Sequence, residues 1–341
     1  MKTLLKLSSI LILLNAIFLS ETIAQSLSIP GQIPELEEQV SVIVEPTLPK
    51  PYEVVKIKAE AYGTDLSRAF ITWKVNNVVK KSGRGEQSFE INSGAPGTLQ
   101  TITLDIQPSG GPLISKVITI KPQEVDVIWE ARSYAPPFYK GKTLQGYMGD
   151  IVVVAIPNFY SAGRPVNSHN PYFKWQLNGD LLSSDSGLGK NFITMTGGIL
   201  LQPQDIQVSV TDDDFNKSER FMTIEPEESF VLFYRNSPLY GIMFNQAIAG
   251  YTLKSPEISL TAIPYFFESS SRSSGKLEYE WRVNGEASPI SSSDTATFRY
   301  VDDKAGTSLV GVTVKNNEEF LQEQSTRARI ELQPEAQKIE F

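Results

Sequence analysis

The chain has 341 residues, a formal net charge of −8, one His and no Cys. This length suits two or three domains, and the ordinary share of apolar residues excludes a disordered chain or a bundle of membrane spans. An acidic surface repels phosphate groups, which argues against nucleic acid as a partner, and the missing thiols exclude disulfides and cysteine-based metal sites.

Residues 1–24 have the pattern of an export signal. Lys2 and Lys6 form a basic flank, Leu11 to Leu19 form a short apolar run, and small residues lead up to Ala24. We predict cleavage after Ala24 and a secreted or cell-surface protein without a membrane span after signal removal. The alternative is a retained membrane anchor, for which the apolar run is short. Residues 25–37 follow as a polar lead-in segment.

The rest of the chain repeats one unit three times. Each copy has a run of alternating residues ending in Ala, then a tryptophan motif, then a closing run ending in Pro. The motifs are ITWKVNN (Ile71–Asn77), FKWQLNG (Phe173–Gly179) and YEWRVNG (Tyr279–Gly285). We predict domains at residues 38–122, 123–226 and 227–335, followed by a C-terminal tail at 336–341.

Alternation with period two predicts that every copy is built from β-strands. Short runs of Val, Ile, Thr and aromatic residues are separated by turns rich in Gly, Ser and Asp. This pattern predicts an all-β fold of three tandem antiparallel β-sandwiches. The linkers between copies are short and contain Pro, which favours a semi-rigid rod.

The tryptophan motif predicts a core residue followed by a hairpin. Because side chains alternate along a strand, Trp73, Trp175 and Trp281 point into the cores while their charged or polar neighbours face water. Asn178-Gly179 and Asn284-Gly285 suit two-residue turns with positive φ at both positions. Asn76-Asn77 is a weaker version of the same turn.

The motif W-x-[VL]-N-[GN], on a Cys-free unit of this length, resembles the immunoglobulin-like and PKD-like sandwiches of bacterial surface proteins. The chain lacks the Cys pair of antibody-type domains and the Gly-Asp-Gly run of the PKD signature. The resemblance implies a stalk or adhesive module outside the cell. In some bacteria such modules accompany type IV pilus machinery, so the resemblance also implies a pilus-associated role.

The sequence predicts no catalytic residues and no cofactor. The sole His, His169, lies in a loop, and the chain has no G-x-S-x-G nucleophile elbow or glycine-rich phosphate loop. A pair of carboxylates that meet only in the folded chain stays open, and with it a hydrolase.

A metal site has one weak candidate in a predicted turn. Asp212, Asp214 and Asn216 have the alternate spacing of calcium loops. Lys217 stands where such loops have Gly, so we favour a solvated turn over a cation site.

Aromatic residues and arginines gather in the long loops before the second and third tryptophan motifs. The predicted binding residues there are Tyr160, Arg164, His169, Phe266, Phe267 and Arg272. The alternative is that these aromatics cap the sandwich or pack against the neighbouring domain. For a second set of aromatic and apolar residues we predict core or junction packing: Trp129, Phe138, Tyr139, Phe233, Leu239 and Tyr240.

Together these features predict an exported, non-enzymatic protein of surface assembly or adhesion. It presents loops or strand edges to a cell-surface protein or glycan. The two alternatives are a carbohydrate-binding module protein and a hydrolase with an unmarked carboxylate site.

Overall fold

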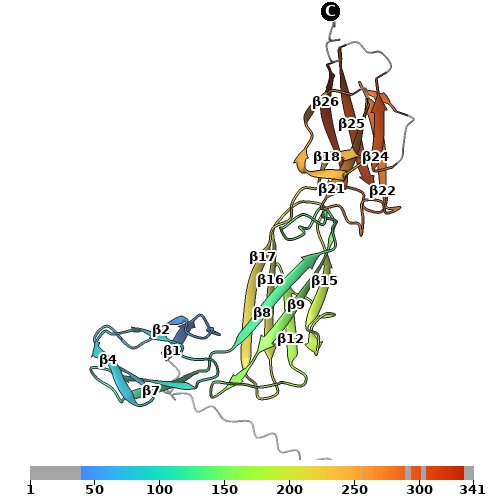
Figure 1. Cartoon of the computed structure of the whole chain (residues 1–341). Coiled ribbons are helices and arrows are strands. Elements are labelled where there is room, and N and C mark those ends of the chain that lie inside the picture. Colours follow the sequence, from blue (N-terminus) through green and yellow to red (C-terminus); the bar gives the residue numbers. More distant parts are fainter. Residues whose placement is uncertain (1–39, 256, 289–292, 301–304, 334–341) are drawn as a thin grey trace, which may run out of the picture.

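The computed structural model describes residues 40–255, 257–288, 293–300 and 305–333 (Figure 1). The predicted signal, lead-in and C-terminal tail lie outside these residues. Every regular element in the described part is a β-strand, and the strands form tandem antiparallel sandwiches as predicted. The predicted domain limits remain predictions.

The strands fall into three consecutive groups, here called the first, second and third sandwich. The first comprises β1 (Val40–Glu45), β2 (Val54–Ala61), β3 (Phe70–Val75), β4 (Val78–Arg84), β5 (Ser88–Asn92), β6 (Gln100–Gln107) and β7 (Ile114–Ile120). The second comprises β8 (Glu124–Ala131), β9 (Asp150–Asn158), β10 (Tyr160–Ser161), β11 (Arg164–Pro165), β12 (Tyr172–Leu177), β13 (Asp180–Leu181), β14 (Gly187–Leu188), β15 (Phe192–Thr196), β16 (Gln204–Thr211) and β17 (Lys217–Ile224). The third comprises β18 (Phe230–Ser237), β19 (Gly241–Ala247), β20 (Gly250–Leu253), β21 (Glu257–Tyr265), β22 (Leu277–Val283), β23 (Glu286–Ala287), β24 (Thr295–Arg299), β25 (Gly306–Asn316) and β26 (Glu323–Leu332).

The same pairing order recurs in each group. The first sandwich has sheets β1-β2-β5 and β4-β3-β6-β7, and the second has β15-β9-β8 and β13-β12-β16-β17. The third has β19-β18-β21-β24 and β20-β26-β25-β22-β23, where β20 pairs parallel with β26. This division of strands between two sheets is that of immunoglobulin-like sandwiches. Figure 1 shows the three groups in an elongated array that bends between the first and second sandwich.

Alternation along the strands places one apolar face of each sheet in a core. In β2, Val55, Ile57 and Ala59 are buried while Val54 and Lys58 are exposed. Each sandwich has its own apolar cluster. The three indoles lie in these clusters, with Trp73 and Trp175 at 0 % exposure and Trp281 at 2 %.

Each buried indole also makes the same hydrogen bond. Nε1 of Trp73 donates to the Glu86 carbonyl at 2.8 Å, and Nε1 of Trp175 donates to the Lys190 carbonyl at 2.9 Å. Trp281 donates to the Ser293 carbonyl at 2.9 Å. The acceptors lie just before the strands β5, β15 and β24, so the indole ties its own sheet to the facing one. A buried indole N–H without a partner would be costly.

The asparagine after each tryptophan has two structural tasks. Asn76, Asn178 and Asn284 all have positive φ, as do the residues that follow them, which gives the predicted two-residue turns. The Oδ1 atom of each also accepts a backbone N–H from a strand paired with the tryptophan strand, at Thr101 of β6, Asp205 of β16 and Leu309 of β25. Asn fits this position because it tolerates the left-handed region and carries an acceptor.

We predict that Trp175→Ala destabilises the second sandwich by about 3–5 kcal/mol, because the change leaves a cavity and removes the indole bond. Trp129→Ala is the matched control, since Trp129 is only partly buried at the edge of that core. Urea unfolding should show a much larger loss for Trp175→Ala, and equal losses would contradict this account.

Candidate functional site: the sandwich junctions and their loops

The segment 132–149, between β8 and β9, leaves the second sandwich and packs on the third. It contributes Tyr134, Ala135, Tyr139 and Leu144 to an apolar cluster built on the third sandwich. We call this set the junction cluster, and its buried members are Tyr234, Ile263, Tyr265 and Phe266. Figure 1 shows these loops crowded between the two sandwiches.

Aromatic rings fill the junction cluster. The centroids of Phe138 and Phe244 lie 4.1 Å apart, and Tyr139 meets Tyr265 and Phe266 edge-on at 6.1 Å and 5.7 Å. Offset and edge-on pairs of this kind add to the hydrophobic gain of burial. The hydroxyls of Tyr234 and Tyr265 meet at 2.9 Å, which satisfies both groups inside the cluster. Burial, followed by this hydrogen bond, raises the pKa of Tyr265 far above its ordinary value.

Hydrogen bonds fix the two sandwiches in register around the cluster. The N–H of Tyr134 donates to the Phe267 carbonyl at 2.7 Å, and the N–H of Phe266 donates to the Tyr134 carbonyl at 2.8 Å. This reciprocal pair is a short antiparallel bridge between sandwiches.

Two further polar side chains of the third sandwich bind the backbone of the second. Gln322, which is 1 % exposed, donates from Nε2 to the Tyr147 carbonyl at 2.7 Å. Glu268 accepts the Asp150 N–H at 2.9 Å. Burial raises the pKa of the Glu268 carboxyl, against the opposing effect of that hydrogen bond.

Gly146 allows the closest approach in this junction. A Cβ atom on Gly146 would lie 2.5 Å from the Phe266 carbonyl oxygen and 2.8 Å from Oγ of Ser229. Contacts this short do not occur, so the backbones could not keep their present distance with any side chain at this position.

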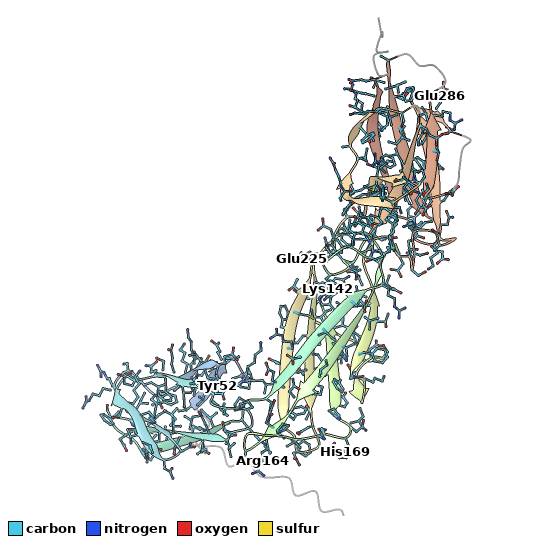
Figure 2. The ribbon with its side chains drawn as sticks, in the orientation of Figure 1. Tyr52, Lys142, Arg164, His169, Glu225 and Glu286 are labelled. Atoms are coloured by element: carbon cyan, nitrogen blue, oxygen red, sulfur yellow. The ribbon has the colours of Figure 1, made fainter. Side chains whose placement is uncertain are left out.

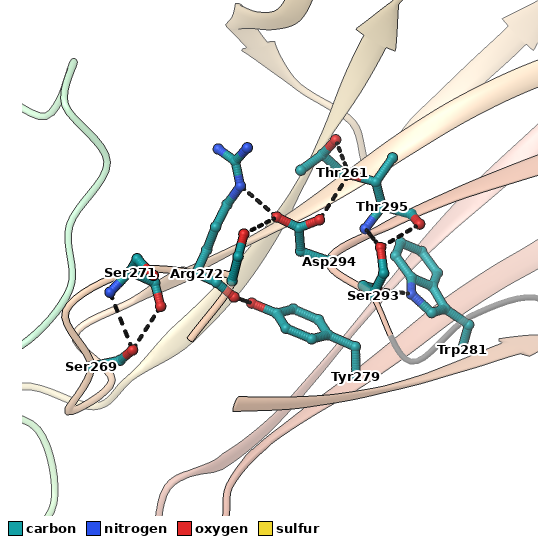
Figure 3. Close-up of polar contacts among 10 residues, drawn as sticks. Thr261, Ser269, Ser271, Arg272, Tyr279, Trp281, Ser293, Asp294 and Thr295 are labelled. Carbon is teal, nitrogen blue, oxygen red and sulfur yellow. Dashed lines mark hydrogen bonds and ion pairs between the residues drawn. The ribbon is translucent and has the colours of Figure 1, made fainter. Parts of the chain in front are cut away.

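Arg272 lies beside the junction, where its charge is already neutralised (Figure 3). Its Nε atom donates to Oδ2 of Asp294 at 2.5 Å, and the Arg272 carbonyl accepts from the Tyr279 hydroxyl at 2.6 Å. Burial disfavours the charge, but the bond to Asp294 outweighs this effect and raises the pKa of Arg272. The adjoining groove of about 620 Å³, lined by Tyr134 and Arg272, therefore offers no free charge from Arg272 to a ligand.

Two of the predicted binding residues are closed to a ligand. Phe266 is 3 % exposed in the junction cluster, and Phe267 is 0 % exposed in the core of the third sandwich. The expectation that these rings present a surface is corrected by this burial. The loop has turned its aromatics inward, as in the packing alternative left open by the sequence.

The junction between the first and second sandwiches is polar. The side chain of Gln123 holds both backbone groups of Tyr160, donating to its carbonyl at 2.8 Å and accepting its N–H at 2.7 Å. The Ala162 N–H donates to the Gly97 carbonyl at 3.2 Å. Gly97 has a φ of 67°, and a Cβ there would lie 2.4 Å from the Tyr160 carbonyl. Tyr160 thus acts at this junction through its backbone.

Asp212, Asp214 and Asn216 form a self-contained turn beside that junction. Oδ1 of Asp212 accepts the N–H groups of Asp214 at 3.0 Å and Asn216 at 2.7 Å, and Oδ2 accepts from Nδ2 of Asn216. Nζ of Lys121 reaches Oδ1 of Asn216 at 2.6 Å, across the junction. Donors thus occupy the side-chain oxygens of Asp212 and Asn216, as expected for a turn and not for a cation site.

Arg164 and His169 are exposed on the loops at the end of the second sandwich that faces the first (Figure 2). They remain candidates for contact with a partner. The structure separates them from the second half of the predicted set, because Phe266, Phe267 and Arg272 lie at the other junction.

The second predicted set divides between packing and exposure. Phe138 and Tyr139 lie in the junction, and Phe233 stacks on Trp281 in the third core. Trp129 lies at the edge of the second core under Nζ of Lys142, 3.5 Å from its ring centroid. Leu239 and Tyr240 are 84 % and 77 % exposed at the tip of the β18–β19 hairpin, so the packing prediction is wrong for these two.

Sequence reasoning missed Tyr134, Gln322 and Glu268, which carry much of the junction between the second and third sandwiches. The available signal was the length of segment 132–149, because the equivalent connection between β1 and β2 in the first copy, 46–53, is much shorter. Its partners lie more than a hundred positions away, and spacing alone does not reveal them.

The described part of the chain contains no group of His, Asp and Glu able to hold a metal ion. It also contains no helix with the length and hydrophobicity that a membrane span requires.

Comparisons with known proteins bear on the fold alone. No protein-family model and no curated protein matches the chain. It is similar to three N-terminal domains of the bacteriophage RB49 highly immunogenic outer capsid protein, with a TM-score of 0.26, 12% identity, 87% of this chain covered and 99% of that one. It is also similar to Bacteroides ovatus SGBP-B in complex with a mixed-linkage heptasaccharide, with a TM-score of 0.21, 13% identity and coverage of 86% and 70%. A bacterial ice-binding adhesin gives a TM-score of 0.22 at 8% identity and covers 83% and 91%. Likenesses this distant carry no argument about function.

We predict that Gly146→Ala loosens the junction between the second and third sandwiches, because the new methyl group collides with the Phe266 carbonyl. Gly275→Ala is the matched control, since a Cβ there has no atom within 4 Å. Amide hydrogen exchange should rise at Tyr134 and Phe266 in Gly146→Ala and stay unchanged in Gly275→Ala. Unchanged exchange in both variants would contradict the role given to Gly146.

Proposed function

We propose that the chain is an exported, non-enzymatic spacer and adhesion protein of the cell surface. The observation that carries this proposal is the junction cluster, which joins two sandwiches into one body and leaves the first on a polar joint. Domains move relative to each other unless their interface is large and apolar. A stiff pair with one hinged sandwich suits a molecule that holds a binding surface away from its attachment point.

The side chains that first suggested chemistry have structural partners. Asp212 completes a turn, Arg272 pairs with Asp294, and Phe267 belongs to a core. What remains exposed is typical of recognition surfaces, such as Arg164 and His169 on loops and Leu239 and Tyr240 on a hairpin tip. We therefore propose that the chain binds a partner and does not catalyse a reaction. The proposed partner is a surface protein or a glycan.

The export pattern of residues 1–24 supports a location outside the cytoplasm. The resemblance of the tryptophan motif to surface sandwiches adds a place in surface assembly, including assembly beside a type IV pilus.

Protease added to intact cells that make this chain should cut it, while a cytoplasmic marker protein stays whole. Deletion of the gene should lower attachment of the cells to surfaces or to each other, and the full chain supplied in trans should restore it. Complete protection of the chain until the cells are lysed would overturn the proposed location and function together.

A further inference from the structure

The outer face of the third sandwich carries a groove with a glycine floor. Register places Arg282 of β22 opposite Gly311 of β25, and Gly311 opposite Arg327 of β26. The groove has a volume of about 620 Å³, and Thr313, Ser325 and Thr326 also line it. We call it the Gly311 groove. The two arginines form its opposite walls, separated by one strand.

The fold itself does not require a glycine at position 311. Its φ lies outside the left-handed region, and the pairing of β25 with both neighbours is continuous there. A Cβ at this position would meet Thr326 O at 3.5 Å and Cγ of Arg327 at 3.6 Å, which are ordinary contacts. Glycine inside a strand costs about 0.5–1 kcal/mol relative to Ala. Such a glycine often marks a place where a ligand approaches the backbone.

The other two sandwiches carry different residues in the equivalent row of paired strand positions. The three cross-strand positions directly after the tryptophan are Lys74, Thr103 and Val117 in the first sandwich, and Gln176, Gln207 and Phe221 in the second. Both copies fill the middle position with a side chain. The combination of arginine, glycine and arginine is particular to the third sandwich.

The two guanidinium groups are weakly engaged within the described residues. Nη2 of Arg282 lies 3.9 Å from Oε2 of Glu280, whose other oxygen pairs with Nζ of Lys315 at 3.1 Å. Nη1 of Arg282 reaches the Gly285 carbonyl only at 3.5 Å. In the residues that the structure describes, the side chain of Arg327 has no hydrogen bond or ion pair. By contrast, Lys74 in the first sandwich pairs with Asp105 at 2.6 Å. The arginines are thus available to an anion, which guanidinium binds with two parallel hydrogen bonds.

The position of the groove decides which kind of anionic molecule fits. Its row lies inside the five-stranded sheet, where the backbone groups are already paired, so a peptide cannot bind there by adding a strand. The hydroxyls of Thr313 and Ser325 lie on the outer face and meet at 2.9 Å, which leaves one O–H group and free lone pairs for the hydroxyls of a sugar.

We propose that the Gly311 groove binds an acidic saccharide. Arg282 and Arg327 hold its carboxylate or sulfate group from two sides, and the threonine and serine hydroxyls bind the sugar ring. This site rests on the binding role proposed above and narrows the glycan partner to an acidic saccharide. The binding test of the groove is separate from the tests of location and attachment, so either can fail without the other.

The test uses the purified full chain on three immobilised polymers: polygalacturonate, dextran sulfate and neutral dextran. The chain should bind at least one acidic polymer and not neutral dextran. Binding to polygalacturonate alone assigns a carboxylated sugar, and binding to dextran sulfate alone assigns a sulfated one. Failure to bind either acidic polymer, or equal binding to neutral dextran, overturns the proposal.

Variants distinguish binding in the Gly311 groove from nonspecific attraction between the chain and a charged polymer. The double variant Arg282→Ala/Arg327→Ala should lower the affinity about tenfold or more, because charge-assisted hydrogen bonds are lost. Arg68→Ala/Arg84→Ala removes the same charge from exposed arginines of the first sandwich and should leave the affinity unchanged. Equal losses in the two double variants would show attraction by net charge only and overturn the proposal.

A second pair of variants tests the glycine floor with both arginines in place. Gly311→Gln introduces the residue that the second copy has at this position, so the sandwich should accept it while the groove is filled. Its binding should fall as in the double arginine variant. Thr103→Gln introduces the same residue at the equivalent position of the first sandwich and should bind like the unchanged chain. Thermal unfolding confirms that each variant folds, and full binding by folded Gly311→Gln would overturn the proposal.

Discussion

The apolar contact between the second and third sandwiches is the constraint on which the arrangement of the molecule depends. Rings from segment 132–149 pack against Tyr234, Tyr265 and Phe266, and a reciprocal backbone bridge at Tyr134 locks their register. Moving these sandwiches apart would expose aromatic surface to water and break the hydrogen bonds of Gln322 and Glu268. The joint at Tyr160 and Gln123 has no comparable apolar cluster in the described residues, so its separation is less costly.

Equivalent loops serve the two joints by different means. In each case the loop before the tryptophan motif meets the preceding sandwich. The second sandwich uses the backbone of Tyr160 against Gly97, whereas the third uses the ring of Phe266 and the acid of Glu268. A single repeated unit thus yields one polar joint and one apolar joint. Arg164, Arg282 and Arg327 are exposed, and no contact across either joint involves their side chains in the described residues.

The sequence predicted the features of the fold that depend on local periodicity and turn chemistry. The burial of Trp73, Trp175 and Trp281 followed from alternation along one strand, and the positive φ of Asn178 and Gly179 followed from turn chemistry. It did not predict the bonds of Gln322 to Tyr147 or of Arg272 to Asp294, because these join separate segments through tertiary packing. Aromatic content placed Phe267 in a loop but could not say whether the ring faces solvent or core. Arg282, Gly311 and Arg327 are far apart in the sequence, and only the register of the paired strands shows that they form one row.

The central claim, a stiff pair of sandwiches with the first one hinged, is tested most directly by distances between spin labels. The chain has no Cys, so labels go only where a Cys is introduced. Thr194 in the second sandwich, Thr297 in the third and Glu90 in the first are exposed strand positions. Pulsed electron resonance on Thr194→Cys/Thr297→Cys should give a narrow distance distribution, and Glu90→Cys/Thr194→Cys a broader one. A distribution across the second and third sandwiches as broad as that across the first and second would contradict the account.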